Sequence, residues 1–369
     1  MAFASGFFAT AAAGESAAPP VARRDVVVDT TFGLRLEDPY RWMETPDSPE
    51  FRSWLLAQGE YTRGRLDAIP GRKRLAARLR ELSFETSGPG ALQRRAGKLF
   101  YLRIDPGSTL SKLVVRDADG KEHVLVDPVD RPGADSSHVS IDNYSVSWDG
   151  SLVAVNLAQG GSEITGVHVF DVATGVERPD VVEHVWGQFT VVWLPDASGF
   201  FYTQMADAGF RDSKVDPILG MRVRRHLLGT SVKQDAVFLA PDSTSSLPIE
   251  PREFPVIDIP IGTHYAIAYC VGAHPQIRTY VAPLEAVQPG KIPWKRVSEY
   301  EDSIANFAPD TASLYLLTRR NAPNGRIVRV PISNPDLKSA EEIVPQSDRI
   351  LSDMTLTRDG FYTLRTEAG

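Results

Sequence analysis

A nucleophilic serine would be the most direct source of chemistry in this chain, which also contains histidine and aspartate. Such a serine commonly sits in a G-x-S-x-G turn between a strand and a helix, because the glycines leave room for a sharp bend. The segment Gly160-Gly161-Ser162-Glu163-Ile164 lacks the second glycine, and its neighbours resemble a hairpin. Ser198 lies between two strand-like runs, and Ser87-Gly88 lies in a linker. We therefore predict no catalytic residue in this chain.

The seven histidines do not have the spacing of a metal site. They are His123, His138, His168, His184, His226, His264 and His274. No two of them, and no histidine with cysteine, form the short pair typical of zinc ligands, so we predict no metal site. His123, His168 and His264 are expected to be ordinary strand residues. His184 precedes the apolar pair Val185-Trp186 and is expected in the interior or at a domain boundary.

Other ligand-binding patterns are also missing. There is no G-x-G-x-x-G opening a helix and no P-loop, so we predict no cofactor-binding residues and no cofactor. Residues 117–120 resemble a calcium loop but lack the later glutamate, and a hairpin turn is expected there. Residues 299–302 are the densest acidic run. They are expected to be a charged loop, although a paired-carboxylate site stays open. The single cysteine, Cys270, lies among apolar residues and is expected to be inert.

Composition narrows the class of protein. The 369 residues carry a formal net charge of -7 and 42% hydrophobic residues, as in an ordinary globular protein able to bury a large core. A negative charge disfavours a nucleic-acid partner, which a basic face would attract. The basic run at Arg222, Arg224, Arg225 and His226 is short, and is expected to be a solvated edge or an internal salt-bridge partner. No run approaches the roughly 20 apolar residues of a membrane span.

Residues 1–21 have the composition of a leader segment, either disordered or related to an export signal. They are rich in Ala, Gly, Ser and Phe, but no Lys or Arg precedes the apolar run as a secretory signal requires. We predict a cytoplasmic protein. The alternative is a periplasmic or secreted protein, if this N-terminus is an incomplete signal peptide.

Residues 22–90 are expected to form a helical lead-in. Ser48 is a suitable N-cap, Pro49 suits the first helical position, and the helix should end before Pro70. Phe51, Trp54 and Leu55 share one face of this helix. A second helix is expected to carry Leu75, Leu79 and Leu82 on one face, before a break at residues 87–90. Apolar faces of this kind suggest packing against something larger.

Residues 91–369 change to short strands with alternating polarity and a recurring hairpin pattern. Each copy has a strand, an Asp- or Gly-bearing turn, and a second strand rich in Val and aromatic residues. The copies span residues 146–155, 192–202, 257–268, 307–316 and 357–364. This repetition in an all-β segment predicts a mainly β fold with propeller blades, about five to six in number and incomplete in the last. An unrelated all-β repeat array is the alternative.

The lead-in carries a distinctive set of residues that resembles the prolyl oligopeptidase family of serine peptidases. They are residues 38–44 (DPYRWME), Trp54, Ala57, Gln58, Thr62, Ile69-Pro70 and Arg72. Residues 125–128 are similar to the end of that family's first blade, and residues 144–154 to the start of its second. The resemblance extends from about residue 22 to the end of the chain. It implies a prolyl-oligopeptidase-type β-propeller preceded by helices.

In that family a seven-bladed propeller is followed by an α/β-hydrolase domain that carries the catalytic Ser, Asp and His. The resemblance therefore implies that this chain stops within a sixth blade. It would be the non-catalytic portion of a serine endopeptidase and would gate the access of short peptides to a hydrolase domain outside this chain, its expected partner. The alternatives are a stand-alone propeller that binds peptides or proteins, and a split enzyme whose hydrolase domain is a separate chain.

Overall fold

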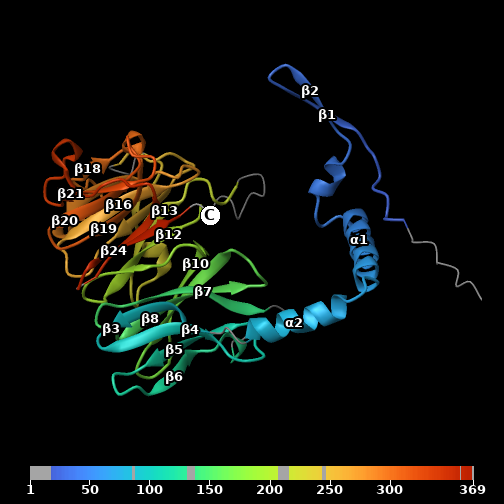
Figure 1. Ribbon diagram of the computed structural model, residues 1–369, viewed down its shortest axis with the longest axis horizontal. Coiled ribbons are helices and arrows are strands. Elements are labelled where there is room, and N and C mark those ends of the chain that lie inside the picture. Colours follow the sequence, from blue (N-terminus) through green and yellow to red (C-terminus); the bar gives the residue numbers. More distant parts are fainter. Residues whose placement is uncertain are drawn as a thin grey trace, which may run out of the picture. The chain divides into compact units, whose positions relative to one another are not determined.

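Figure 1 shows the computed structural model, which describes residues 18–84, 88–130, 138–206, 216–242, 247–357 and 359–367. Residues 1–17 of the expected leader therefore lie outside the described residues. The chain forms two compact units, residues 1–86 and residues 87–369. None of the helices that the structure describes combines the length and the apolar character needed to span a bilayer.

The N-terminal unit is a hairpin followed by helices. Its elements are β1 (Val27–Thr31), β2 (Leu34–Asp38), the 3-10 turn η1 (Arg41–Glu44), α1 (Pro49–Asp67) and α2 (Arg72–Phe84). Both predicted helices are confirmed. The Ser48 hydroxyl accepts a hydrogen bond from the Phe51 backbone N–H at 3.1 Å, and Pro49 is the first helical residue. The local sequence thus fixes where α1 begins.

Three aromatic rings hold the start of α1 against η1. Trp42 packs edge-on against Phe51 and Trp54, with ring centroids 6.5 Å and 6.1 Å apart. No residue of α1 is buried, however, and Leu56 keeps 69% of its surface exposed. Leu75 of α2 is 62% exposed. The helices therefore present apolar side chains that the described structure does not cover.

The second unit is built from antiparallel sheets that follow one another along the chain (Figure 1). Blade 1 contains β3 (Gly90–Arg95), β4 (Lys98–Ile104), β5 (Ser111–Arg116) and β6 (Glu122–Val126); blade 2 contains β7 (Val139–Val146), β8 (Leu152–Gln159), β9 (Ile164–Asp171) and β10 (Glu177–Trp186). Blade 3 contains β11 (Val192–Trp193), β12 (Gly199–Gln204), β13 (Arg222–Leu227) and β14 (Ala236–Leu239); blade 4 contains β15 (Phe254–Asp258), β16 (Tyr265–Val271), β17 (Arg278–Pro283) and β18 (Lys295–Ser298). Blade 5 contains β19 (Ile304–Pro309), β20 (Ser313–Thr318), β21 (Arg326–Pro331) and β22 (Glu341–Val344), and β23 (Ile350–Leu356) pairs with β24 (Phe361–Thr366).

The recurring sequence pattern marks the first hairpin of a blade. Its five copies coincide with β7–β8, β11–β12, β15–β16, β19–β20 and β23–β24. The predicted mainly β propeller is therefore confirmed. Among its described residues, blades 1, 4 and 5 are separate four-stranded sheets, blades 2 and 3 are joined in one eight-stranded sheet because β10 pairs with β12, and β23–β24 is a two-stranded sheet. Short 3-10 turns lie between strands: η2 (Pro128–Asp130), η3 (Val232–Gln234), η4 (Leu284–Ala286), η5 (Tyr300–Asp302) and η6 (Leu337–Ser339).

The turn of the second blade shows why the pattern specifies a hairpin. The Asp149 carboxylate accepts hydrogen bonds from the Ser147 and Ser151 hydroxyls at 2.6 Å and 2.8 Å. Gly150 has φ +68°, a left-handed conformation that side chains disfavour. A Cβ at Gly150 would also lie 3.1 Å from the Cβ of Ala96, so the turn is close to blade 1. The Asp-Gly pair therefore closes the hairpin and permits contact between blades.

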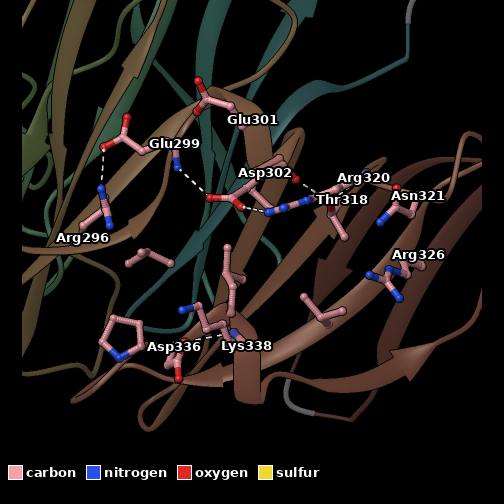
Figure 2. Close-up of a pocket in the computed structure, with 15 residues that line it drawn as sticks. Arg296, Glu299, Glu301, Asp302, Thr318, Arg320, Asn321, Arg326, Asp336 and Lys338 are labelled. Carbon is pink, nitrogen blue, oxygen red and sulfur yellow. Dashed lines mark hydrogen bonds and ion pairs between the residues drawn. The ribbon is translucent and has the colours of Figure 1, made fainter.

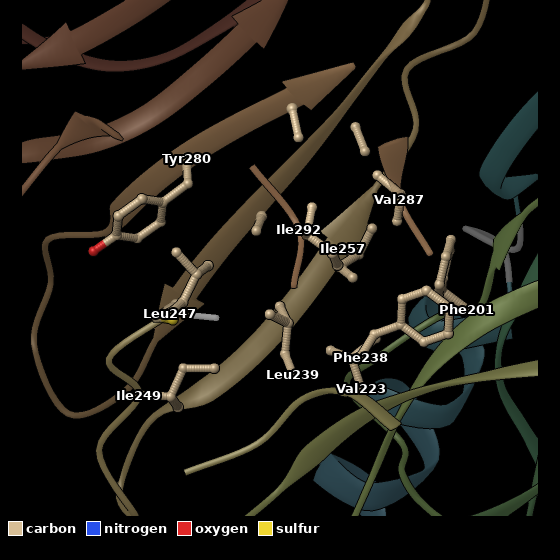
Figure 3. Close-up of a cluster of buried hydrophobic side chains, with 14 of the residues drawn as sticks. Phe201, Val223, Phe238, Leu239, Leu247, Ile249, Ile257, Tyr280, Val287 and Ile292 are labelled. Atoms are coloured by element: carbon tan, nitrogen blue, oxygen red, sulfur yellow. The ribbon is translucent and has the colours of Figure 1, made fainter. Parts of the chain in front are cut away.

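Apolar side chains from neighbouring blades interlock to form the core. Figure 3 shows one such cluster, in which Phe201 and Phe238 of blade 3 lie beside Ile257 of blade 4. The Phe201 and Phe238 rings meet edge to face at 4.9 Å. Trp193 joins blades 2 and 3, because its indole N–H donates to the Ser145 carbonyl at 3.0 Å. Since a single sheet buries only part of its apolar surface, each blade depends on its neighbours.

Pairing within the blades is regular in the middle and irregular at the flanks. The second and third strands of all five four-stranded blades pair without a register shift. The third and fourth strands shift register in every one of them. The first and second strands also shift in blades 1, 2 and 5 and in β23–β24. Such irregularities bend a strand and increase its local twist.

Candidate functional site

A cavity of about 410 Å³ lies where the first strands of four blades converge. It is lined by Gln93 and Arg95 of β3, by Ser145, Val146 and Trp148 at the end of β7, by residues 190–193 around β11, and by residues 258–261 at the end of β15. The first strand of a propeller blade faces the central channel. We call this space the channel cavity. All four strands contribute their C-terminal ends, so the cavity lies at one end of the channel.

Gln93 fixes the position of the β3 wall. Its side-chain amide donates to the Tyr144 carbonyl at 2.8 Å and accepts from the Val146 N–H at 3.2 Å, so it bridges the first strands of blades 1 and 2. Arg95 follows two residues later on the same strand. Because side chains alternate along a strand, Arg95 shares the face of Gln93. This placement directs Arg95 toward the channel cavity.

Arg95 is a half-buried cation without a carboxylate partner among the described residues. One terminal nitrogen donates to the Arg94 carbonyl at 2.8 Å, while its Nε is buried and makes no hydrogen bond. Burial lowers the pKa of Arg95 from its ordinary value, partly offset by the Tyr144 hydroxyl. Guanidinium groups stay protonated in proteins even so. The β3 wall therefore presents an uncompensated positive charge.

Asp258 contributes the opposite charge from blade 4. It is half-buried at the end of β15, and within the described parts of the chain no cation lies within ion-pairing distance of its carboxylate. Burial raises the pKa of Asp258 to about 6, although the Ile259 N–H favours the ionised form. At neutral pH the carboxylate is therefore mostly ionised. The channel cavity thus holds an unpaired cation and an unpaired anion on the walls of two non-adjacent blades.

Between these charges the walls combine apolar side chains with polar groups. Trp148 is half-buried at the β7 end, and Ile261 beside Pro260 is 53% exposed. The exposed Thr190 adds a hydroxyl. A small site with apolar walls and a few converging polar groups is the usual form of a ligand pocket. The cavity can accommodate a short ligand that carries both charges.

A second cavity, of about 560 Å³, lies between blades 4 and 5 and is shown in Figure 2. Its guanidinium groups already have carboxylate partners: Arg320 pairs with Asp302 at 2.6 Å, Arg326 with Glu342 at 3.2 Å, and Arg296 with Glu299 at 4.0 Å. The guanidinium groups of this second cavity are therefore neutralised by carboxylates, whereas Arg95 and Asp258 of the channel cavity have no ion-pair partner among the described residues. We therefore treat the channel cavity as the candidate site.

The acidic run at residues 299–302 lines this second cavity and differs from the expected charged loop. It forms the helical turn η5, because the Glu299 backbone N–H donates to the Asp302 carboxylate at 3.0 Å. Glu299 turns inward and accepts from the Tyr280 hydroxyl at 3.0 Å. The run is thus packed into the structure at both ends.

Ser162, Ser198 and most of the histidines lie as the sequence predicted, while Ser87 of the predicted linker lies outside the described residues. Ser162 is in the β8–β9 turn, where its hydroxyl accepts from the Ile164 N–H at 3.0 Å, and Ser198 is in the β11–β12 turn. His123 and His168 lie in strands, and the His168 Nδ1 is 2.6 Å from a Glu177 carboxylate oxygen. The prediction for His264 was wrong. It lies in an exposed bend before β16, because the turn around Gly262 extends further than the pattern indicated.

The remaining histidines fall at the ends of strands and in loops. His184 is half-buried on β10 with φ +63°, and His138 is exposed just before β7. His274 stacks on Tyr300 at 4.8 Å. Among the residues that the structure describes, no three His, Cys, Asp or Glu side chains are grouped so as to hold a metal ion.

His226 is buried between two carboxylates, which favours the salt-bridge alternative over a solvated edge. Its Nδ1 lies 3.0 Å from Asp235 of blade 3, and its Nε2 lies 3.4 Å from Asp180 of blade 2. The Tyr202 hydroxyl donates to Asp235 at 2.8 Å. Burial alone would lower the pKa of His226, but Asp235 and Asp180 outweigh it and raise this pKa above its ordinary value. The group ties two blades together.

A second buried ionic group surrounds Arg278 in blade 4. Arg278 is ion-paired with Glu253, which also accepts from the Tyr300 hydroxyl. The Arg278 guanidinium donates to the Pro248 carbonyl at 2.7 Å and lies over the Tyr300 ring. Cys270 is buried nearby, and burial raises the pKa of its thiol to about 12. Since the thiolate is the reactive form, Cys270 is held in its unreactive state.

These features define a β-propeller preceded by a helical segment. Residues 19–367 match the family described as "Prolyl oligopeptidase, N-terminal beta-propeller domain", and the chain belongs to this family. The suspected resemblance, and with it the prolyl-oligopeptidase-type propeller, is thereby confirmed.

Relatives and solved structures agree with this assignment. The prolyl endopeptidase of Elizabethkingia meningoseptica is 27% identical over 333 residues, which cover 88% of this chain and 44% of the relative. Prolyl oligopeptidase A of Amanita bisporigera is 24% identical over 367 residues, which cover 89% and 46%. A structure from a study of two prolyl endopeptidases and their inter-domain dynamics has a TM-score of 0.79 and 28% identity, and the match covers 94% of this chain and 50% of that one. The chain therefore spans about half the length of the relatives it matches.

The sequence did not single out the channel cavity. Trp148 and Asp258 stand inside two of the hairpin copies, but nothing distinguished them from other strand-end residues. Arg95 precedes the first hairpin copy, in a segment that contains no recognised motif. The available signal was positional, because each residue ends or follows the first strand of a blade. Arg95, Trp148 and Asp258 line one cavity only because the blades are arranged around a common channel, which places blade 4 near blade 1.

Proposed function

We propose that this chain is the non-catalytic lead-in and propeller portion of a prolyl-oligopeptidase-like serine endopeptidase. In this role it restricts access to an α/β-hydrolase domain outside residues 1–369, so that short peptides enter and larger chains do not. The observation that carries the proposal is the family match over residues 19–367 in a chain that spans half of its relatives. Excluding large substrates and bulk water from a covered site is a recognised contribution to such catalysis.

The purified chain alone is expected to show no peptidase activity. Hydrolysis of a proline-containing p-nitroanilide peptide should not exceed that of a heat-denatured sample of the same chain. The measurement is the release of p-nitroaniline with and without a serine-directed inhibitor. Turnover that the inhibitor abolishes would show that the nucleophile lies within this chain and would contradict the proposal.

The gating role can be tested by adding the chain to a separately produced hydrolase domain of the family. The rate on a polypeptide the length of a small protein should fall several-fold, while the rate on a short peptide should not fall. An unrelated propeller of similar size is the control. If neither rate changes while the chain binds peptides alone, a stand-alone binding module is favoured.

Association with the hydrolase domain should depend on the uncovered apolar face of the lead-in. Leu56→Glu changes a side chain that is 69% exposed, so the free energy of unfolding of the chain alone should change by no more than about 0.5 kcal/mol. Binding to the hydrolase domain should weaken about tenfold or more, because an unpaired charge would be buried. Arg65→Glu, at an exposed position on the opposite face of the same helix, is the control, and light scattering or calorimetry gives the affinities. Equal binding by both variants and wild type would argue against this face.

A further inference from the structure

We propose that the channel cavity is a binding site for a short zwitterionic peptide, whose α-carboxylate meets Arg95 and whose α-ammonium group meets Asp258. The inference rests on the proposed function, in that short peptides are taken to enter this channel. It goes beyond size exclusion by naming the two peptide termini as the recognised groups.

The two unpaired charges carry the argument. A half-buried ion loses part of its hydration, and this cost is recovered only when an opposite charge or hydrogen bonds replace the lost water. Arg95 has a buried Nε without a hydrogen bond, and Asp258 has no cation among the described residues within ion-pairing distance. Elsewhere in the propeller, buried charges such as Arg278 and Asp180 do have partners. At the channel cavity, two charges of opposite sign without ion pairs among the described residues line one space, which fits a ligand that supplies both charges.

The positions of the charges favour a peptide over a compact ion. Arg95 belongs to blade 1 and Asp258 to blade 4, so blades 2 and 3 and their apolar residues lie between them along the wall. An extended tripeptide spans at most about 11 Å, so its two charged ends can reach groups on different blades, which a compact ion cannot do. Trp148 and Ile261 offer apolar surface to its side chains, and the Thr190 hydroxyl can bond its backbone. A peptide free at both ends satisfies every one of these groups.

The test is calorimetric titration of the full chain with Ala-Pro-Ala, its N-acetyl derivative and its C-amide. Free Ala-Pro-Ala is expected to bind about tenfold or more tightly than either blocked form, since a charge-assisted hydrogen bond contributes on this scale. Arg95→Gln should weaken free-peptide binding by a similar factor and abolish the difference between free peptide and C-amide. Asp258→Asn should instead abolish the difference between free peptide and N-acetyl peptide.

Matched controls are Arg94→Gln, the exposed neighbour of Arg95, and Asp348→Asn, an exposed carboxylate with no side-chain hydrogen bond or ion pair to any residue that the structure describes. Both should bind like wild type. If a channel variant fails to fold by circular dichroism, the blocked peptides still test the proposal on wild-type protein. Equal affinity for free and blocked peptides, or no binding of free peptide at millimolar concentration, would overturn it. If terminus recognition fails but the gating effect is observed, this proposal is refuted and the proposed function stands. If terminus recognition is observed but gating is not, the proposed gating function is refuted and this proposal stands.

Discussion

Replacing Asp235 by alanine is expected to lower the free energy of unfolding of the propeller by about 3–5 kcal/mol, the usual cost of removing one partner from a buried ion pair. Asp235 holds the His226 imidazole at 3.0 Å, in a place where His226 is wholly buried. The change also removes the acceptor of the Tyr202 hydroxyl. Chemical denaturation followed by tryptophan fluorescence measures the loss.

The same pair should make stability depend on pH in a defined direction. Because the pKa of His226 is raised in the folded chain, its contribution is fully present below the unfolded value of about 6.5 and is lost as pH rises through the folded pKa. The pKa of Asp180 is lowered by the Gly229 N–H and by His226 against the opposing effect of burial, so Asp180 stays ionised across this window. The partners Arg178 and Arg224 also stay charged.

Asp235→Asn, which keeps the shape of the side chain, isolates this charge effect. Its loss of stability relative to wild type should be larger at about pH 5.5 than at about pH 8.5, because the imidazolium that Asp235 stabilises is more populated at the lower pH. Asp348→Asn should show no such difference between the two pH values. A loss for Asp235→Asn that is independent of pH, or larger at the higher pH, would show that His226 is not held as the imidazolium.

Gly199→Ala is expected to destabilise the propeller by about 3 kcal/mol, although it adds a single methyl group. A Cβ at Gly199 would lie 2.1 Å from the His226 carbonyl oxygen and 3.0 Å from the Leu227 Cα. Both atoms are backbone, so the methyl can be accommodated only by pushing β12 and β13 apart. The shift would also move His226 away from Asp180. Urea denaturation measures the change in the unfolding midpoint.

Gly90→Ala is the matched control within the same unit. Gly90 is also a strand residue, but an added Cβ would meet nothing within 4 Å, and its φ is not in the left-handed region. Alanine there should leave stability unchanged or raise it by about 0.5 kcal/mol, because it restricts the unfolded chain. If both glycine variants lost the same stability, the cost would come from backbone freedom and not from the contact of β12 with β13.

Features set by neighbouring residues were predictable from the sequence. The start of α1 follows from Ser48 and Pro49, and each first hairpin follows from a turn with its own hydrogen-bonding groups, as at Asp149. The propeller architecture followed from repetition of these hairpins. Such elements are stabilised mainly by contacts within a few residues, so the sequence pattern carries their full signal.

Features that depend on blade closure could not be predicted in the same way. Asp180 is 46 residues from His226, and the two meet only because blades 2 and 3 pack together. The basic run around His226 therefore left a solvated edge and an internal salt bridge equally open. Arg95 and Asp258 are even further apart along the chain. Their role depends on the absence of nearby partners, which a sequence does not record.

The register shifts at the flanks of the blades have a consequence for how the molecule moves. Hydrogen bonds next to a bulge are fewer and less regular, so local opening should begin there. Backbone amides should then exchange with deuterium first in the fourth strands and last in the regular middle pairs, such as β16–β17. Since first strands of several blades also contain shifts, the lining of the channel can adjust its width while the middle of each blade stays closed. The propeller would thus have a flexible channel lining, formed by the first strands, and a rigid middle of each blade, formed by the second and third strands.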